Sequence, residues 1–356
     1  MINIKSRVQK LRSLMEKHEI DALLVSKPEN IYYMSGFTGG SDARLLISFD
    51  QNYILTDTRY SEQAARECPE WRLVEEKPLE IKELVELSGD FARIGVEGHY
   101  LSYQFCQELQ GSLKSKVLFL ANIVEELRLI KDEFEIQLLK EAARINDEVF
   151  ADMCRKIGTG ISERRLANDI VYLLKEKGCK KESFDVIAVS AENAALPHGQ
   201  PGERCLQKGD MLTLDYGGFY QGYASDMTRT VAVAETSQQF RDRYKAVLEA
   251  QELGISLVKA GAVCRDIDRS IRECLKKYGL DIYFIHGTGH GLGLEIHEQP
   301  SVSSRSEAVL MENMVITIEP GIYIPRWGGI RIEDTVIVKN GGCEVISCSP
   351  KNLLII

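Results

Sequence analysis

Residues 209–233 read GDMLTLDYGGFYQGYASDMTRTVAV, and this stretch decides how the rest of the chain is organised. Its pattern predicts a strand, a glycine turn and a second strand. Leu212 and Leu214 alternate with Thr213 and Asp215, so the apolar pair points to one face of the first strand and the polar pair to the other. Aspartate is depleted in strands, and a buried carboxylate must be paired, hydrogen-bonded or bound to a metal. Asp215 is therefore a candidate functional residue.

The returning strand carries a second acid, Asp226, on the same face as Thr228 and Thr230. The hairpin consequently directs two carboxylates into one space. Two anions at close range repel each other, and a cation between them removes that repulsion. Taken singly, either aspartate would be interpreted as a turn or capping residue; as a pair they predict a cation site.

The composition restricts the class of protein. A chain of 356 residues suggests two domains, and 44% hydrophobic with 27% charged residues is typical of a soluble globular protein. The formal charge of −9 argues against a nucleic-acid partner, which would require a basic face. No apolar run approaches the ~20 residues of a membrane span, and the charged N-terminus does not resemble a signal peptide. Nine scattered cysteines without a CxxC pair indicate a reduced, cytoplasmic protein.

The first 120 residues alternate helical and strand patterns, which predicts a compact α/β unit. The apolar spacing indicates a helix over residues 4–18 and strands over 22–25, 44–49 and 53–56. Residues 30–40, NIYYMSGFTGG, are interpreted as an aromatic-rich loop and turn. No catalytic set is recognised in this part of the chain.

The remainder shows the order helix, helix, sheet twice. Asp132 followed by Glu135 predicts a capping-box start for a long helix, and Ser162 opens the next one. The expected elements are helices over 133–156 and 162–178, a strand over 184–189, the hairpin at 209–233, helices over 238–259 and 265–278, a histidine- and glycine-rich segment at 286–300, and a second hairpin at 314–338.

The second hairpin echoes the first. Thr213-Leu-Asp215 is matched by Thr317-Ile-Glu319, and Asp226-Met-Thr228 is matched by Glu333-Asp-Thr335, with glycine turns between the arms in both cases. The parallel suggests two halves that meet face to face around one site. Four carboxylates would then converge, and two divalent cations would neutralise them.

A histidine joins this acidic set. His290 lies in GTGHGLG, where flanking glycines leave the backbone free of side-chain bulk and permit positive φ, so the imidazole could approach a metal closely. A dinucleotide-binding loop is the competing interpretation, but the segment does not open a helix after a strand within a βαβ unit. A phosphate loop is disfavoured because Gly-Lys-Ser/Thr is absent.

The proposed ligand set combines oxygen donors with one imidazole. Its members are Asp215, Asp226, His290, Glu319 and Glu333. This donor set suits manganese, cobalt, iron or zinc, and the lack of thiolates disfavours a structural zinc. Paired metals can deprotonate a water and polarise a carbonyl, which is the chemistry of amide hydrolysis.

The motifs around these residues, taken in order, resemble those of a known enzyme family. The order LDYGG, SDMTRT, HGTGHGLGLEIHE, ITIEPGIY and GIRIED resembles the metallopeptidases with the pita-bread fold, in the branch of the Xaa-Pro aminopeptidases and Xaa-Pro dipeptidases (prolidases). The resemblance implies an α/β (α+β) protein in two domains. Residues 1–122 would form a small creatinase-like α/β domain. Residues 123–356 would form the pita-bread domain, with pseudo-two-fold helix-helix-sheet halves.

The resemblance also implies roles for the ligands. Asp215 would chelate one metal, Asp226 and Glu333 would bridge the two metals, and His290 with Glu319 would complete the other. Manganese is the expected metal, with cobalt, zinc and iron as alternatives. A homodimer is also expected from the resemblance.

Four residues would take part in catalysis by the same resemblance. Glu319 would move a proton from the water to the leaving amine, His198 in LPHG would stabilise the developing oxyanion, and His297 would contact the substrate. Arg331 would tether a site carboxylate, although a strand salt bridge is the alternative for it. His286 is interpreted as a packing or outer residue.

The leading functional expectation is a two-metal exopeptidase that cleaves between an N-terminal residue and a following proline. An Xaa-Pro dipeptidase is the nearest alternative. Methionine aminopeptidase is more remote, because of the large N-terminal domain and the GIRIED context. A non-catalytic peptide-binding relative would lack bound metal.

Overall fold

The computed structural model describes residues 3–77 and 80–356, and its contacts divide the chain into two compact units, residues 1–128 and 129–356. Contacts therefore group α6 (Ile123–Arg128) with the first unit. The domain division expected from the sequence, after residue 122, stays a prediction. None of the helices formed by the described residues has the length and hydropathy needed to cross a bilayer.

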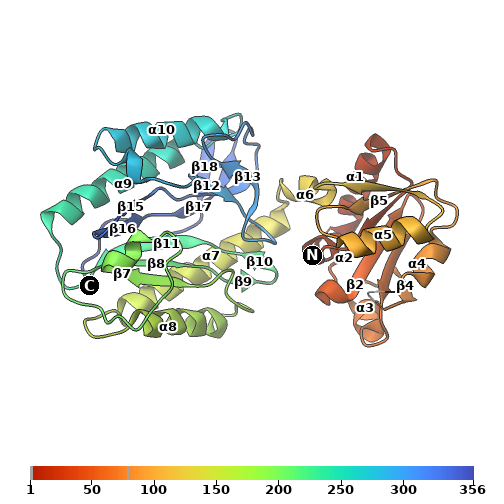
Figure 1. Ribbon diagram of the computed structural model, residues 1–356, viewed down its shortest axis with the longest axis horizontal. Helices are drawn as coiled ribbons and strands as arrows, with labels where there is room; N and C mark the ends of the chain where they lie inside the picture. The colour runs from red at the N-terminus through yellow and green to blue at the C-terminus, as the bar shows by residue number, and fades with distance from the viewer. Residues whose placement is uncertain (1–2, 78–79) are drawn as a thin grey trace. The chain divides into compact units, whose positions relative to one another are not determined.

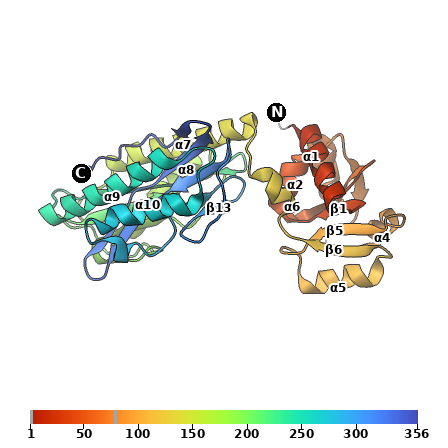
Figure 2. The same cartoon turned by 90° about the horizontal axis from the view of Figure 1, so that it is seen from above.

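The first unit is built on a six-stranded mixed sheet in the order β4-β3-β2-β1-β5-β6 (Figures 1 and 2). Its central strand, β1, pairs antiparallel with β2 and parallel with β5. All four residues of β1 are buried because helices cover both faces of the sheet. The strands are β1 (Ala22–Val25), β2 (Ala43–Ser48), β3 (Asn52–Thr56), β4 (Arg72–Glu75), β5 (Arg93–Glu97) and β6 (Lys116–Leu120); the remaining helices are α1 (Ile4–Lys17), α2 (Pro28–Ser35), α3 (Ser61–Glu67), α4 (Lys82–Leu87) and α5 (Tyr103–Ser112).

The expectation of a loop over residues 30–40 is wrong, because α2 occupies most of this segment. Pro28 stands in the first turn of the helix, where its missing N–H is not needed, and Gly36 ends the helix in the left-handed conformation at φ 78°. The buried carboxylate of Glu97, at the end of β5, accepts hydrogen bonds from the backbone N–H groups of Ser26 and Lys27, at 2.5 and 2.7 Å. The cap for α2 therefore comes from a residue 70 positions further along the chain.

In the second unit the predicted long helices are confirmed. They are α7 (Glu133–Cys154), α8 (Glu163–Glu176), α9 (Gln238–Leu257) and α10 (Cys264–Lys276). The capping box at α7 is present: Asp132 accepts from the N–H of Glu135, and Glu135 accepts from the N–H of Asp132. Ser162 caps α8 by accepting from Arg165 N–H.

The hairpin at 209–233 forms β8 (Met211–Tyr216) and β11 (Met227–Ala232), paired antiparallel with Thr228 opposite Asp215. β7 (Ile187–Ser190) pairs with the other edge of β8 and begins three residues later than expected at 184. The turn contains a further small hairpin, β9 (Phe219–Tyr220) with β10 (Tyr223–Ala224). A Cβ at Gly217 would lie 1.7 Å from the Ser225 carbonyl oxygen, so only glycine fits there.

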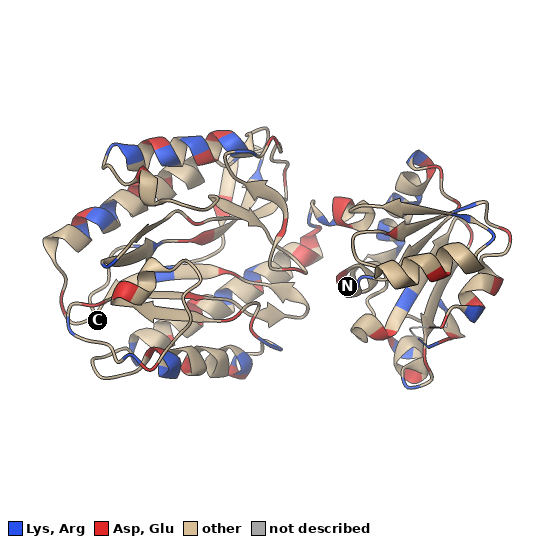
Figure 3. Ribbon diagram, viewed as in Figure 1, with Lys and Arg blue, Asp and Glu red and all other residues tan. Residues whose placement is uncertain are grey.

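The second sheet of this unit has the order β13-β12-β14-β17-β18, and β15 pairs with β16 as a separate two-stranded ribbon. Figure 3 shows acidic positions on the central strands as well as on the outer helices. The strands are β12 (Gly289–Gly291), β13 (Glu298–Val302), β14 (Val315–Ile318), β15 (Gly321–Ile324), β16 (Gly328–Arg331), β17 (Asp334–Lys339) and β18 (Gly342–Val345).

The two sheets meet where β11 runs beside residues 331–335. Glu333 N–H donates to the Thr228 carbonyl at 3.2 Å, and the Thr335 hydroxyl donates to the Asp226 carbonyl at 3.0 Å. These bonds connect the ends of strands that carry acids. The fold therefore brings the acids of both hairpins to one junction.

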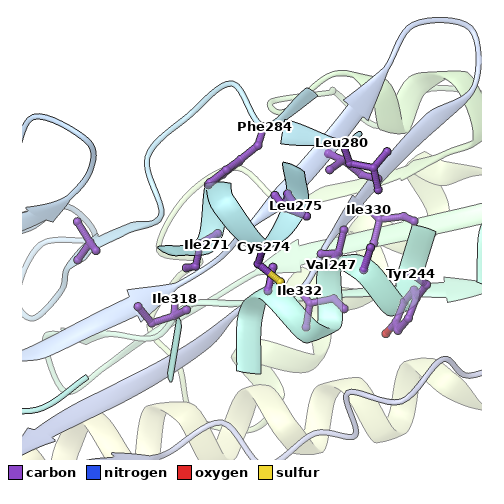
Figure 4. Packing of buried hydrophobic residues seen from close by; sticks show 14 of the residues in the cluster. Tyr244, Val247, Ile271, Cys274, Leu275, Leu280, Phe284, Ile318, Ile330 and Ile332 are labelled. Carbon is purple, nitrogen blue, oxygen red and sulfur yellow. The ribbon is translucent and has the colours of Figure 1, made fainter. Parts of the chain in front are cut away.

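Separate apolar cores hold the helices on these sheets. α7 and α8 pack with β8 and β11, whereas α9 and α10 pack with the second sheet and the β15–β16 ribbon (Figure 1). Figure 4 shows Val247 of α9 and Ile271 and Leu275 of α10 in the same cluster as Ile318 and Ile330. Each buried aliphatic side chain of this kind contributes about 1.5–3 kcal/mol.

Candidate active site

A cavity of about 400 Å³ lies at the junction of the two sheets. Its wall contains every residue that the sequence nominates: Asp215, Asp226, His290, Glu319, Glu333, His198, His297 and Arg331. His286 also lines it, although the sequence suggested only a packing or outer role. The structure thus brings together residues that are up to 135 positions apart in the chain, from His198 to Glu333.

The tightest part of the cluster consists of Asp226, His290 and Glu333, whose potential ligand atoms lie within 4.8 Å of one another. His290 Nε2 lies 3.4 Å from Asp226 Oδ2 and 3.5 Å from Glu319 Oε1. Asp215 faces β11 from β8, since its partner in the register is Thr228. The side chains therefore surround one space from both hairpins.

The glycines beside His290 allow neighbouring segments of the backbone to approach closely. A Cβ at Gly289 would lie 2.0 Å from the Thr317 carbonyl oxygen, and one at Gly291 would lie 2.2 Å from the Gln299 carbonyl oxygen. Neither glycine has positive φ, so the conformational freedom suggested from the sequence is not what these positions use. The backbone N–H of His290 donates to Thr317 Oγ1 at 3.1 Å.

Two oxygens in this cluster test whether a divalent cation fits. Asp215 Oδ1 and Glu333 Oε1 are buried and have no hydrogen-bond partner within the described part of the chain. Glu333 Oε2 already accepts from Thr228 Oγ1 at 2.7 Å, so one oxygen of that carboxylate remains available. Buried anionic oxygens without partners are costly unless a cation binds them. The donor set of four carboxylates and one imidazole fits divalent metal ions.

The pKa values of the cluster also indicate that negative charge is crowded there. Burial raises the pKa of Asp226 to about 6 and that of Glu319 to about 7, against the opposing effect of the nearby His290. Burial and the charge of Asp226 raise the pKa of Glu333 well above its ordinary value. Burial lowers the pKa of His290, but Asp226 and Glu319 outweigh that effect and raise it to about 9. The crowded carboxylates of this cluster therefore favour the binding of protons or of metal cations.

Arg331 connects the two hairpins. Its guanidinium donates to Asp215 Oδ2 and to the Tyr323 hydroxyl, and to Thr228 Oγ1 at 3.1 Å. It also donates to the Pro197 carbonyl at 3.3 Å, next to His198. The side chain is 5% exposed. Arg331 is therefore buried and hydrogen-bonded to Asp215, and it does not form an exposed salt bridge.

Tyr323 and His286 extend this network, and the sequence did not nominate Tyr323. His286 Nδ1 lies 2.7 Å from the Gly287 carbonyl, which can only accept, so Nδ1 carries the proton. Nε2 then accepts from the Tyr323 hydroxyl at 2.8 Å. Burial and the charge of Arg331 lower the pKa of His286 to about 4, which keeps it neutral. The motif ITIEPGIY contained Tyr323, but nothing in the pattern distinguished it from a packing residue.

His198 and His297 lie in more exposed parts of the cavity wall. The His297 ring lies edge-on to the His290 ring, with centroids 4.5 Å apart. Burial and the neighbouring His290 lower the pKa of His297. Both imidazoles are accessible to a ligand in the cavity.

Comparison with known proteins identifies the family. Residues 137–340 match metallopeptidase family M24, and residues 7–130 match the creatinase/prolidase N-terminal domain. The chain is 36% identical to a Pyrococcus furiosus protein named Xaa-Pro dipeptidase, over 99% of this chain and 100% of that protein.

Solved structures agree with this assignment. An Xaa-Pro dipeptidase from Bacillus anthracis superposes with a TM-score of 0.96 at 38% identity, covering 99% of this chain and all of that one. An X-Pro aminopeptidase from Thermotoga maritima gives 0.90 at 32% identity, covering 98% of this chain and 99% of that one. Family membership implies a divalent metal and a peptide substrate. The chain belongs to metallopeptidase family M24 and carries a creatinase/prolidase N-terminal domain.

Proposed function

We propose that this chain is a two-metal exopeptidase that hydrolyses the bond between an N-terminal residue and a following proline. The observation that carries the proposal is the cluster of four carboxylates and His290 at one cavity, in which two buried carboxylate oxygens have no hydrogen-bond partner among the residues that the structure describes. The similarity to an Xaa-Pro dipeptidase and an X-Pro aminopeptidase supports the substrate class.

In this proposal two divalent ions would be held by the four carboxylates and the imidazole of the cluster, Asp215, Asp226, Glu319, Glu333 and His290. When bound, divalent ions supply a water that is deprotonated near neutral pH and a Lewis acid for the scissile carbonyl. Manganese is the first choice, with cobalt, zinc and iron as alternatives, because oxygen donors dominate the set.

The side chains of the cavity supply the remaining chemistry. Glu319 accepts a proton from the attacking water at a carboxylate oxygen and delivers it to the leaving proline nitrogen. His198 donates to the oxyanion that develops on the scissile carbonyl, and His297 contacts the substrate beside it. Arg331 keeps Asp215 in place.

Proline explains why a dedicated site is needed. The imide nitrogen has no N–H, and the ring fixes the backbone, so general peptidases act poorly on this bond. An Xaa-Pro dipeptidase remains the alternative, because it shares the same chemistry and differs in how much peptide is accepted beyond proline.

The test compares Xaa-Pro, Xaa-Pro-Xaa and Met-Ala-Xaa peptides with the manganese-loaded protein. We expect release of the first residue from the tripeptide with proline, and loss of that activity in Asp226→Ala and Glu333→Ala. Hydrolysis of Xaa-Pro alone would favour the dipeptidase, and cleavage without proline would favour a methionine aminopeptidase. A protein that neither binds metal nor cleaves any of the peptides would be a non-catalytic relative.

The wider assignment is also part of the proposal. We place the enzyme in the cytoplasm, because its nine cysteines are free and five of them are buried. We propose a homodimer. The functional domains are proposed as residues 1–122 and 123–356.

A further inference from the structure

Two residues on one face of α10 hold the segment that leads to His290. Arg272 lies one helical turn after Asp268, and its Nε donates to Asp268 Oδ2 at 2.8 Å. Asp268 is fully buried, and the Arg272 side chain is 31% exposed. Neither residue lines the cavity that contains the carboxylate cluster.

Arg272 donates hydrogen bonds to backbone carbonyls of this segment at two alternate residues. Its Nη1 donates to the Phe284 carbonyl at 2.7 Å and its Nη2 donates to the His286 carbonyl at 2.6 Å. The guanidinium also stacks 4.3 Å from the centroid of the Phe284 ring. A planar fork can reach both carbonyls at once, whereas an ammonium cannot.

Asp268 is hydrogen-bonded to the next alternate residue, Thr288. Its Oδ1 accepts a hydrogen bond from Thr288 Oγ1 at 2.9 Å. The backbone of Thr288 in turn donates to the Val302 carbonyl and accepts from the Glu319 N–H, both at 2.8 Å. One helical turn of α10 therefore fixes a residue that lies two positions before His290 and is bonded to Glu319.

An ordinary surface salt bridge would not have these contacts. Arg269 and Asp266, on the same helix, form such a pair, with exposures of 65% and 48%. Asp268 is buried, and a buried charge is costly unless several groups satisfy it. The pair is oriented toward the backbone that carries one expected ligand and adjoins another.

We propose that Asp268 and Arg272 are positioning residues that set the separation of His290 from Glu319 and thereby the affinity of the site for metal. The inference rests on the proposed function, in which His290 and Glu319 are ligands. Partners outside the ligand shell that orient the ligands typically change metal affinity by about 10–100-fold. Their loss should therefore appear in metal binding before it appears in substrate binding.

The experiment titrates the metal-free, full-length chain with Mn²⁺ by calorimetry. We expect Arg272→Met to raise the Kd for Mn²⁺ about 10–100-fold and to lower kcat at fixed Mn²⁺ with little change in KM. Arg272→Lys should recover only part of the affinity. The matched control, Arg269→Met on the same helix, should bind Mn²⁺ as the wild type does.

A second pair of variants distinguishes a loss of positioning from a general loss of folding. Thr288→Val removes only the hydroxyl that Asp268 accepts from, while Thr288→Ser keeps it, so the valine variant should bind Mn²⁺ more weakly than the serine variant. A lowered thermal midpoint with an unchanged Kd in both Arg272→Met and Thr288→Val would overturn the proposal, as would a wild type that binds no Mn²⁺. If the variants show these shifts in Kd but the wild type cleaves no Xaa-Pro peptide, the proposed function alone is rejected.

Discussion

Arg331 joins the two hairpins of the second unit through a single side chain, and four groups accept hydrogen bonds from it. We expect Arg331→Met to lower kcat/KM about 10–100-fold, because Asp215 loses its tether beside the metal. Arg331→Lys should not restore activity, since an ammonium cannot reproduce the planar contacts. Steady-state kinetics measure this, with the exposed Arg305→Met as the control. Wild-type kinetics in Arg331→Met would contradict the tethering role.

The cysteines provide a pH-dependent prediction. Burial raises the pKa of Cys179 and of Cys264 to about 11, and burial disfavours the thiolate, which is the reactive form. At pH 8 only about one in a thousand of these thiols is ionised. Iodoacetamide should therefore label the exposed Cys205 at pH 8 and spare both buried thiols, whose reaction should quicken as pH rises toward 11. Peptide mass spectrometry measures the labelling; rapid modification of Cys179 at pH 8 would contradict its burial.

At the residue scale, the sequence predicted the acids and His290 because carboxylates and an imidazole are conspicuous within or directly beside apolar strands. It did not predict Tyr323 or Asp268. Their roles depend on partners brought close only by the fold: Tyr323 bonds to His286 and Arg331, and Asp268 bonds to Thr288. A tyrosine or a helical acid alone gives no such signal.

At the scale of elements, α8 fastens the loop that carries His198. Glu163, in the first turn of α8, is fully buried and accepts from the Ser190 N–H at 2.7 Å and from the Gly202 N–H at 3.1 Å. We expect Glu163→Ala to lower the free energy of unfolding by about 2–4 kcal/mol, because several buried hydrogen bonds are lost. It should also lower kcat/KM, since the His198 loop loses its anchor at both ends.

The control for this variant is Glu176→Ala, at the exposed other end of the same helix. Denaturant unfolding and peptide hydrolysis would be measured for both proteins. Equal stability of the two variants, or a Glu163→Ala enzyme with wild-type kcat/KM, would show that the loop does not depend on α8.

Helix α7 and helix α2 explain which elements the sequence could predict. The cap of α7 is local, with Asp132 and Glu135 three residues apart, so the pattern predicted its start correctly. At the N-terminus of α2, Glu97 from β5 accepts hydrogen bonds from the backbone N–H groups of Ser26 and Lys27, and the N-cap side chain makes no capping bond. This contribution comes from a distant residue, so no local pattern contains it. The small β9–β10 hairpin was not predicted for a different reason, because the glycines around it favoured a simple turn.

At the scale of the whole molecule, the repeated order of helix, helix and sheet was visible because both hairpins place acids at matching positions. The separate pairing of β15 with β16 was not visible, since the second hairpin was expected to be continuous over 314–338. Strand pairing between distant segments depends on packing that no short pattern contains.

The proposed homodimer is tested by light scattering coupled to size-exclusion chromatography. We expect a mass twice the chain mass of 40.1 kDa, independent of protein concentration in the micromolar range. The control is the same measurement after metal removal, which should leave the mass unchanged if assembly does not depend on the site. A mass of a single chain would reject the dimer and leave the catalytic proposal intact.

The central claim is that the crowded carboxylates and His290 are made stable together by two divalent ions. Equilibrium dialysis of the full-length chain against Mn²⁺, followed by elemental analysis, measures this directly. The expected result is two ions per wild-type chain, with fewer ions bound by Glu333→Ala, because that variant loses a shared carboxylate. A wild type that retains no Mn²⁺, or a Glu333→Ala variant that binds two ions with unchanged affinity, would contradict the claim.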